Sequence, residues 1–249
     1  MWTMIVTFFS PKGGSGKSSS LLAFLSAIAL KNATSPDAAD QDRVLVIDHD
    51  PQGSITKFFD RRDELKANSY SIAFETITNS KDLIDALNSK KGAYDWILID
   101  FPGHFSELNA AIALLSDRII IPTNLELIEA QEATAFYNRL SSLLSDVDSN
   151  TAVSLMIVRI PQAAQFLPRF SKDLINQLRH RGYAVLRGML SSQQAIPNMV
   201  NYGKYLFEIL LDDRSSKSTL KAIEESNYLY RALKDWELLP VTTDEANEE

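Results

Sequence analysis

A glycine-rich segment near the N-terminus carries residues of the types that bind phosphate. It spans Ser10–Ser19, between an apolar run, Met4–Phe9, and a long apolar helical pattern. Glycines let backbone N–H groups converge on phosphate oxygens, and the start of the following helix favours an anion. In this setting Lys17 is expected to reach the β- and γ-phosphates of a nucleotide, and the Ser18 hydroxyl is expected to coordinate Mg²⁺.

Two further segments place aspartates directly after apolar, strand-like runs. One run ends at Asp48 and continues through D-H-D-P-Q-G to Asp50, and a second run ends at Asp100. At such strand ends one carboxylate can orient the attacking water, while another can bind Mg²⁺, which takes oxygen ligands and keeps several waters. We predict Asp100 as the magnesium residue, with Asp48 beside the hydration shell of the ion. Alternation along the strand turns His49 away from both acids, so it is expected to pack rather than act as a base.

The phosphate loop departs from the ordinary pattern G-x-x-x-x-G-K-[ST], because Pro11 stands where that pattern has glycine. It has instead a second lysine, Lys12, and the sequence K-G-G-S-G-K-S resembles the deviant phosphate loop of the ParA/MinD superfamily of ATPases. The D-H-D-P-Q-G segment, Ile119–Asn124 and Asn201–Glu208 extend this resemblance over about residues 4–234. The nucleotide-binding residues that it implies are Lys12, Gly13, Gly14, Ser15, Gly16, Lys17, Ser18 and Ser19.

The resemblance also implies roles for three catalytic residues. Lys17 acts on the nucleotide of its own chain, Lys12 reaches the nucleotide of a partner chain, and Asp50 positions the attacking water. The chain departs from the family in two places. Phe101 follows the magnesium aspartate where relatives usually have a small residue, and residues 190–192 read L-S-S where relatives commonly show I-P-R near the adenine. Adenine contacts therefore cannot be assigned residue by residue.

Several features favour the ParA side of the superfamily over the MinD side. The D-P-Q-G and Y-G-K stretches are ParA-like, and the chain ends in D-E-A-N-E-E, where a MinD-like protein is expected to carry a basic membrane-binding helix. No membrane partner is therefore expected. The absence of cysteine excludes relatives with cysteine-bound iron–sulfur clusters. Two alternatives stay open: a metabolic synthase on the same scaffold, for which we find no second-substrate motif, and a MinD-like membrane-cycling ATPase.

The elements that must position these residues alternate along the chain as strand and helix. Near-continuous apolar strands between helices predict an α/β fold: a single doubly wound, mostly parallel sheet with helices on both faces. Residues 1–236 are predicted to form one ATPase domain, followed by an acidic, disordered tail over residues 237–249. The predicted strands are Met4–Phe9, Val44–Asp48, Trp96–Asp100, Arg118–Ile121, Ala152–Val158 and Ala184–Leu190. The predicted helices are Lys17–Leu30, Lys81–Asn88, Leu108–Leu115, Leu125–Leu144, Arg169–His180 and Ser218–Lys234.

Basic residues concentrate late in the chain. Residues 150–234 carry 12 Lys and Arg against 6 Asp and Glu, although the net charge of the whole chain is −7. The segment Asp212–Lys221 resembles the family stretch that contacts DNA phosphates, although an ordinary solvated helix start is the alternative reading. The predicted DNA-binding residues are Arg214, Lys217, Lys221 and, as a weaker addition, Arg187.

The function implied by the resemblance is that of a partition ATPase. Such a protein hydrolyses ATP with Mg²⁺, weakly by itself, and forms a homodimer when ATP is bound. The dimer binds DNA without sequence preference and positions a cargo through an adaptor protein of ParB-like role. The N-terminal residues lack a signal-peptide pattern, so we expect a cytoplasmic protein that is nucleoid-associated when ATP-bound. The sequence leaves the cargo and the adaptor open.

Overall fold

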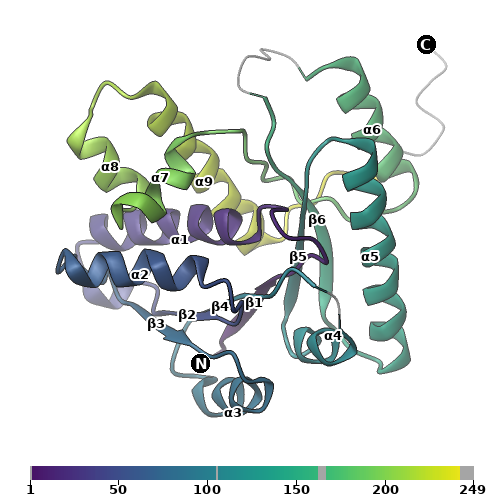
Figure 1. The fold of residues 1–249 in the computed structure, drawn as a ribbon, viewed down its shortest axis with the longest axis horizontal. Coiled ribbons are helices and arrows are strands. Elements are labelled where there is room, and N and C mark those ends of the chain that lie inside the picture. The colour runs from purple at the N-terminus through teal and green to yellow at the C-terminus, as the bar shows by residue number, and fades with distance from the viewer. Residues whose placement is uncertain (1, 105, 162–166, 242–249) are drawn as a thin grey trace.

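Six parallel strands form one sheet in the order β3-β2-β4-β1-β5-β6 (Figure 1). The computed structural model describes residues 2–104, 106–161 and 167–241. Every neighbouring strand pair is parallel, which confirms the predicted sheet type. The strands are β1 (Met4–Phe8), β2 (Val44–Asp48), β3 (Ile72–Thr76), β4 (Trp96–Asp100), β5 (Arg118–Thr123) and β6 (Ala152–Ile157).

Helices cover both faces of this sheet, as a doubly wound fold requires (Figure 1). The first face carries α1 (Lys17–Thr34), α2 (Ser54–Glu64), α7 (Ala195–Tyr202), α8 (Leu206–Asp212) and α9 (Lys217–Asp235), and the second carries α3 (Ser80–Lys90), α4 (Glu107–Ala113), α5 (Leu127–Asp146) and α6 (Arg169–His180). A short 3₁₀ turn, Ala38–Asp40, precedes β2. Among the helices of the described ranges, none combines the length and the apolar character that a membrane crossing demands.

The strands divide their side chains between two apolar cores. In β1, Val6 and Phe8 pack under α1 and α9, whereas Ile5 and the following Phe9 pack under α4 and α5. Alternation along each strand produces this division, because successive side chains point to opposite faces. Burial of each large apolar side chain contributes about 1.5–3 kcal/mol, so the two cores hold the strand ends in fixed positions.

The strand register brings the predicted acids to one edge of the sheet. Asp100 of β4 lies opposite Asp48 of β2 on one side and opposite Phe8 of β1 on the other. The carboxyl end of β1 leads directly into the phosphate loop. Ligands of open α/β sheets bind at this edge, near the point where the strand order reverses.

Several elements differ from the sequence prediction. Ala184–Leu190 is not a strand: it runs beside β6 and makes only isolated bridges, including Leu155 with Val185. Within this segment Gly188 packs against the backbone of α9. The sequence patterns missed β3, α2, α7 and α8. β3 is a half-exposed edge strand, and α2 buries a narrow face on an otherwise charged helix.

The tail boundary predicted at residue 236 stays a prediction, but ordered contacts run past it. The Leu239 N–H donates to the Val185 carbonyl at 2.8 Å, and the Arg187 N–H donates to the Glu237 carbonyl at 2.8 Å. Most of the predicted tail, residues 242–249, lies outside the described residues.

Candidate active site

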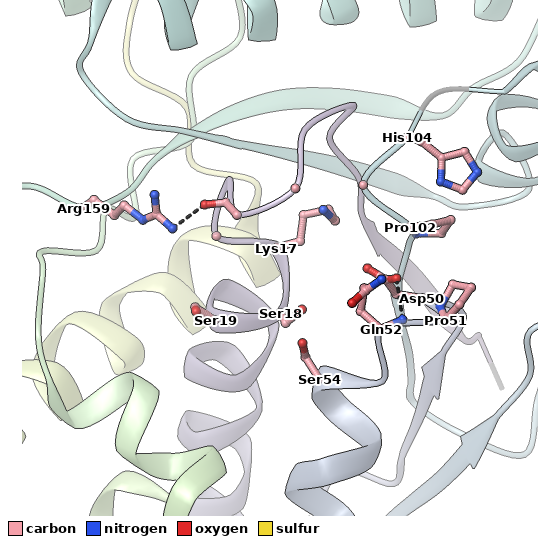
Figure 2. A pocket seen from close by; sticks show the side chains of 14 residues that line it. Lys17, Ser18, Ser19, Asp50, Pro51, Gln52, Ser54, Pro102, His104 and Arg159 are labelled. Atoms are coloured by element: carbon pink, nitrogen blue, oxygen red, sulfur yellow. Dashed lines mark hydrogen bonds between the residues drawn. The ribbon is translucent and has the colours of Figure 1, made fainter.

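The phosphate loop borders a cavity of about 680 Å³ at the carboxyl edge of the sheet (Figure 2). Two loop glycines have left-handed backbones, Gly14 at φ 76° and Gly16 at φ 100°, which side-chain-bearing residues rarely adopt. Gly16 is the N-cap of α1, so the free N–H groups of that helix face the loop. The cavity is lined by Gly13, Gly14, Gly16, Lys17, Ser18, Ser19, Asp50, Pro51, Gln52, Ser54, Pro102, Gly103, His104 and Arg159.

Lys17 is a buried residue of the cavity wall, and its charge interacts with those of two acids. Its side chain donates to the Lys12 carbonyl at 3.3 Å, and the residue is 5% exposed. Burial lowers the pKa of Lys17, while the charges of Asp100 and Asp50 oppose that shift. A buried ammonium among acids, with few donors satisfied, is suited to receive an anionic ligand.

Ser18 and Asp100 form the part of the site that fits a divalent cation. The Ser18 hydroxyl donates to Asp100 Oδ2 at 2.6 Å, and Asp100 is fully buried. Asp100 Oδ1 has no hydrogen-bond partner among the described residues. Burial raises the pKa of the Asp100 carboxyl to about 7, with the Ser18 hydrogen bond acting against the rise. An unpartnered carboxylate oxygen beside a hydroxyl is the oxygen donor set that Mg²⁺ prefers.

Asp48 and Asp50 have different surroundings, although only His49 separates them. Asp48 Oδ2 accepts from the N–H and the hydroxyl of Thr56, both at 2.8 Å, so this acid holds the first turn of α2. Its Oδ1 accepts from the Asp50 N–H at 3.1 Å. Asp50 itself is half-buried and lines the cavity, where its Oδ1 accepts from the Gln52 N–H at 3.0 Å. The acid that faces the ligand space is therefore Asp50.

The loop after β4 closes the cavity on the side of Lys17. A Cβ on Gly103 would lie 3.0 Å from the Gly13 backbone and 3.1 Å from Lys17 Nζ, so a side chain there would force the phosphate loop to shift. Phe101, where the chain departs from the family, packs in the second core. Its ring centroid lies 5.1 Å from the ring centroids of both Phe9 and His49. His49 is buried, with Nδ1 2.5 Å from the Ile77 carbonyl, in agreement with the packing role predicted for it.

Lys12 lies outside the cavity that holds Lys17. Its ammonium donates to Glu129 and lies 3.5 Å from Glu132, both on α5. The hydrogen bond to Glu129 raises the pKa of Lys12. In the single chain, the structure therefore separates the two lysines of the loop.

A second cavity, of about 250 Å³, adjoins the first. The loop over residues 190–194 forms one wall, where Glu225 of α9 accepts from the Ser191 N–H at 2.9 Å and from its hydroxyl at 2.6 Å. The Gln193 side-chain oxygen Oε1 accepts from the Ser218 hydroxyl at 2.9 Å. This loop coincides with the departure from I-P-R. Its polar lining was not assigned from the sequence, because no local pattern ties it to α9.

Arg159 lines both cavities and was also missed by the sequence reasoning (Figure 2). It lies two residues after the end of β6, and its guanidinium donates to the Gly14 carbonyl of the phosphate loop. No motif marks it: the contact joins residues 145 positions apart in the chain.

The four predicted DNA-binding residues do not gather at one place. Arg214 and Lys217 are exposed at the start of α9, and neither has an ion pair among the described residues. Lys221 lies one turn further along, 3.8 Å from Glu225. Arg187 pairs with Glu237, just beyond the C-terminal end of α9. At 1.5 Å per residue, that end of the helix, Asp235, lies roughly 27 Å from Lys217.

Comparisons with known proteins agree with this fold. A sequence model of the family described as VirC1 protein matches residues 3–249. The protein virC1 of Rhizobium rhizogenes is 28% identical over 158 residues, which cover 62% of this chain and 63% of that relative. The match therefore spans less than two thirds of the length of this curated relative.

Two solved structures show the same architecture. A protein described as a plasmid partition protein of Borrelia burgdorferi, bound to AMPPNP, superposes with a TM-score of 0.66 at 19% identity, covering 94% of this chain and 100% of that one. The cell division protein MinD of Aquifex aeolicus superposes at 0.64 and 19% identity, covering 96% of this chain and 100% of the other. The predicted likeness to the ParA/MinD superfamily is confirmed, and the fold alone does not separate its two sides.

Proposed function

The chain belongs to the VirC1 family, and we propose that it is an ATPase of ParA type that positions a DNA-linked or protein cargo. The observation that carries this proposal is the cavity lined by Lys17, Ser18 and Asp50, with the buried Asp100 hydrogen-bonded to Ser18 behind the cavity wall. Phosphoryl transfer depends on positioning and on charge stabilisation, and these residue types supply both.

In this proposal the phosphate loop and α1 hold the triphosphate, and Ser18 and Asp100 hold Mg²⁺. Backbone N–H groups of the loop donate to phosphate oxygens, and the Lys17 ammonium neutralises their charge. Bound Mg²⁺ supplies positive charge that stabilises the phosphate oxygens during transfer. Asp100 carries for this purpose an oxygen, Oδ1, that has no hydrogen-bond partner among the described residues. Asp48 acts indirectly, by fixing the turn from which Asp50 projects.

Asp50 is proposed to orient the water that attacks the γ-phosphate. It is half-buried in the cavity wall, close enough to Lys17 for their charges to interact. A carboxylate in this position can accept a hydrogen bond from water and hold it in line with the transferred group.

The base of the nucleotide is proposed to occupy the second cavity. Gly16 and Ser19 line both cavities, so a nucleotide whose phosphates lie on the loop has its base directed there. Gln193 and Gln194 provide side-chain amides in the wall. The Gln193 amide already donates to Ser191 Oγ at 2.7 Å and accepts from the Ser218 hydroxyl, so the base would share or replace these hydrogen bonds.

ATP-dependent dimerisation is proposed to bring Lys12 to the phosphates of a partner chain. Support comes from the position of Lys12, which is exposed and does not line the cavity around Lys17. While its ammonium pairs with Glu129 and Glu132 of α5, it cannot bind a phosphate in the cavity of its own chain. Two chains that face each other across this edge would also double the basic residues of α9 on one assembly.

DNA binding without sequence preference is proposed for the start of α9. Arg214 and Lys217 are exposed, and the Ser216 cap leaves N–H groups that can meet phosphates. The Arg214/Lys217/Lys221 triple alanine variant should lower the magnitude of the log–log salt slope by roughly 0.9 per lost contact, measured with random duplex DNA and ATP. Lys81→Ala, an exposed lysine on α3 at the other face of the sheet, is the matched control and should bind as the parent does. Unaltered DNA binding by the triple variant would contradict the proposal.

One set of measurements tests the whole proposal on the purified full chain. ATP with Mg²⁺ should convert monomer to dimer in sedimentation velocity, and the dimer should retain duplex DNA at low salt. ATP binding without dimerisation would favour the synthase alternative, and co-sedimentation with anionic vesicles would favour membrane cycling. Absence of ATP binding would overturn the proposal. The cargo, an adaptor of ParB-like role that stimulates hydrolysis, and nucleoid association in cells belong to the same proposal.

A further inference from the structure

Arg159 has a backbone conformation that arginine seldom adopts. It follows the last residues of β6 and has φ of +59°, in the left-handed region that favours glycine. Such conformations persist only where the surrounding structure fixes them, and they concentrate at functional sites.

The residues on both sides of Arg159 are fixed by hydrogen bonds. The Val158 N–H donates to the Thr123 carbonyl of β5 at 2.8 Å. The Ile160 N–H donates to the Leu190 carbonyl at 3.2 Å, and the Ile160 carbonyl accepts from the Ser192 N–H at 2.7 Å. Arg159 is therefore anchored between β5 and the loop that walls the second cavity.

The side chain of Arg159 is directed at the phosphate loop. Its guanidinium donates to the Gly14 carbonyl, and Figure 2 shows it on the opposite side of Lys17 from Asp50. Val158 packs closely on Gly16 of the phosphate loop: a Cβ added to Gly16 would lie 3.3 Å from Val158 Cγ2. The segment after β6 thus packs on the loop through both neighbouring side chains.

Arg159 lies where the two cavities meet. With Gly16 and Ser19 it is among the residues that line both. If the terminal phosphate lies between Lys17 and Asp50, and the base lies in the second cavity, the junction receives the phosphate nearest the sugar. A guanidinium has five donors in a planar fork, so it can keep the Gly14 carbonyl and still bind a phosphate oxygen.

We propose that Arg159 is a nucleotide-binding residue that holds the α-phosphate. This inference rests on the proposed function, because it requires that the two cavities hold one nucleotide. It predicts a loss of affinity that is equal for ATP and ADP, since both carry the α-phosphate. A residue that acted on the γ-phosphate would affect ATP alone.

Isothermal titration calorimetry of the full chain with unmodified ATP and ADP tests this inference. Arg159→Asn is the informative variant, because asparagine tolerates a positive φ and keeps the backbone in place. It should weaken both nucleotides by the same factor, about 10- to 100-fold for a lost charge-assisted hydrogen bond. Arg159→Lys should recover part of that loss, and Arg169→Ala, an exposed arginine on α6, should bind as the parent does.

The outcomes distinguish this inference from the function on which it rests. If the parent chain binds neither nucleotide, the proposed function fails. If the parent binds and Arg159→Asn binds equally well, or loses affinity for ATP alone, only the role of Arg159 is overturned. A lower melting temperature of the nucleotide-free variant, with no recovery of affinity in Arg159→Lys, would assign the residue a purely structural role and also overturn the inference.

Discussion

The two lysines of the phosphate loop lie five residues apart, yet their surroundings are opposite. Lys17 is 5% exposed. Burial lowers its pKa, and the charges of Asp100 and Asp50 oppose that shift. Lys12 has a side chain 45% exposed, and its hydrogen bond to Glu129 raises its pKa. One lysine is enclosed in its cavity, while the other is paired on the surface of α5.

This difference shows which part of the site a single chain completes. The half around Lys17 has in place the N–H groups suited to an anion, the oxygens of Ser18 and Asp100 suited to a cation, and the loop after β4. The half around Lys12 opens instead onto a separate cavity of about 490 Å³, which Pro11, Phe136 and Arg139 also line. Under the proposed function, Lys12 must exchange its carboxylate partners for phosphate oxygens when two chains meet.

The largest effect is expected from Lys17→Ala. Loss of the buried ammonium should weaken ATP binding by about 100-fold or more, because charged hydrogen bonds in a desolvated site are strong and the acids beside it are left without a counter-charge. Calorimetric titration with ATP measures this, with Lys81→Ala on the exposed face of α3 as control. Unchanged affinity would remove the contrast between the two lysines, because the enclosed Lys17 would then hold no phosphate.

Asp50→Ala should separate binding from turnover in the enclosed half. We expect hydrolysis to fall about 100-fold, the scale of a misplaced reactant, while ATP binding and ATP-dependent dimerisation persist. A phosphate-release assay beside sedimentation measures both, and Asp60→Ala, exposed on α2, is the matched control. Normal hydrolysis in Asp50→Ala would shift the water-orienting role to another residue.

Lys12→Ala should leave the enclosed half intact. ATP affinity of the monomer is expected to stay within a few-fold of the parent, while ATP-dependent dimerisation or hydrolysis is lost, because Lys12 lies outside the cavity of its own chain. Sedimentation velocity with ATP and Mg²⁺ measures the dimer. A variant that still dimerises and hydrolyses normally would show that the surface lysine takes no part in the reaction.

The smallest effect is expected when the carboxylates that hold Lys12 are neutralised. The Glu129→Gln/Glu132→Gln variant frees the ammonium from an exposed pair, so dimerisation with ATP should require roughly 2- to 5-fold less protein, in keeping with the modest strength of surface ion pairs. Concentration-dependent sedimentation measures the shift, with Glu126→Gln, also exposed, as control. A weaker dimer in this variant would instead indicate that these acids serve the interface themselves.

The sequence determined the enclosed half of the site and little of the open half. Gly16, Lys17 and Ser18 follow one strand within a few residues, and Asp100 ends the neighbouring strand, so local pattern and parallel pairing place them together. The parallel sheet was predictable because its central strands are continuous apolar runs. β3 and α2 escaped prediction because their buried faces are narrow and interrupted by polar residues.

Tertiary structure alone decided the contacts that join distant segments. Lys12 pairs with Glu129 across 117 positions, and Arg159 reaches Gly14 across 145. Tertiary structure also placed Arg187 far from the start of α9 and brought Asp48 to the first turn of α2, where it accepts from the Thr56 N–H. Helix and strand periodicities report which face of an element is buried, but not which residue of another element that face meets. Long, flexible side chains such as those of Lys12 and Arg159 find their partners only when the packed sheet brings the helices and loops around them.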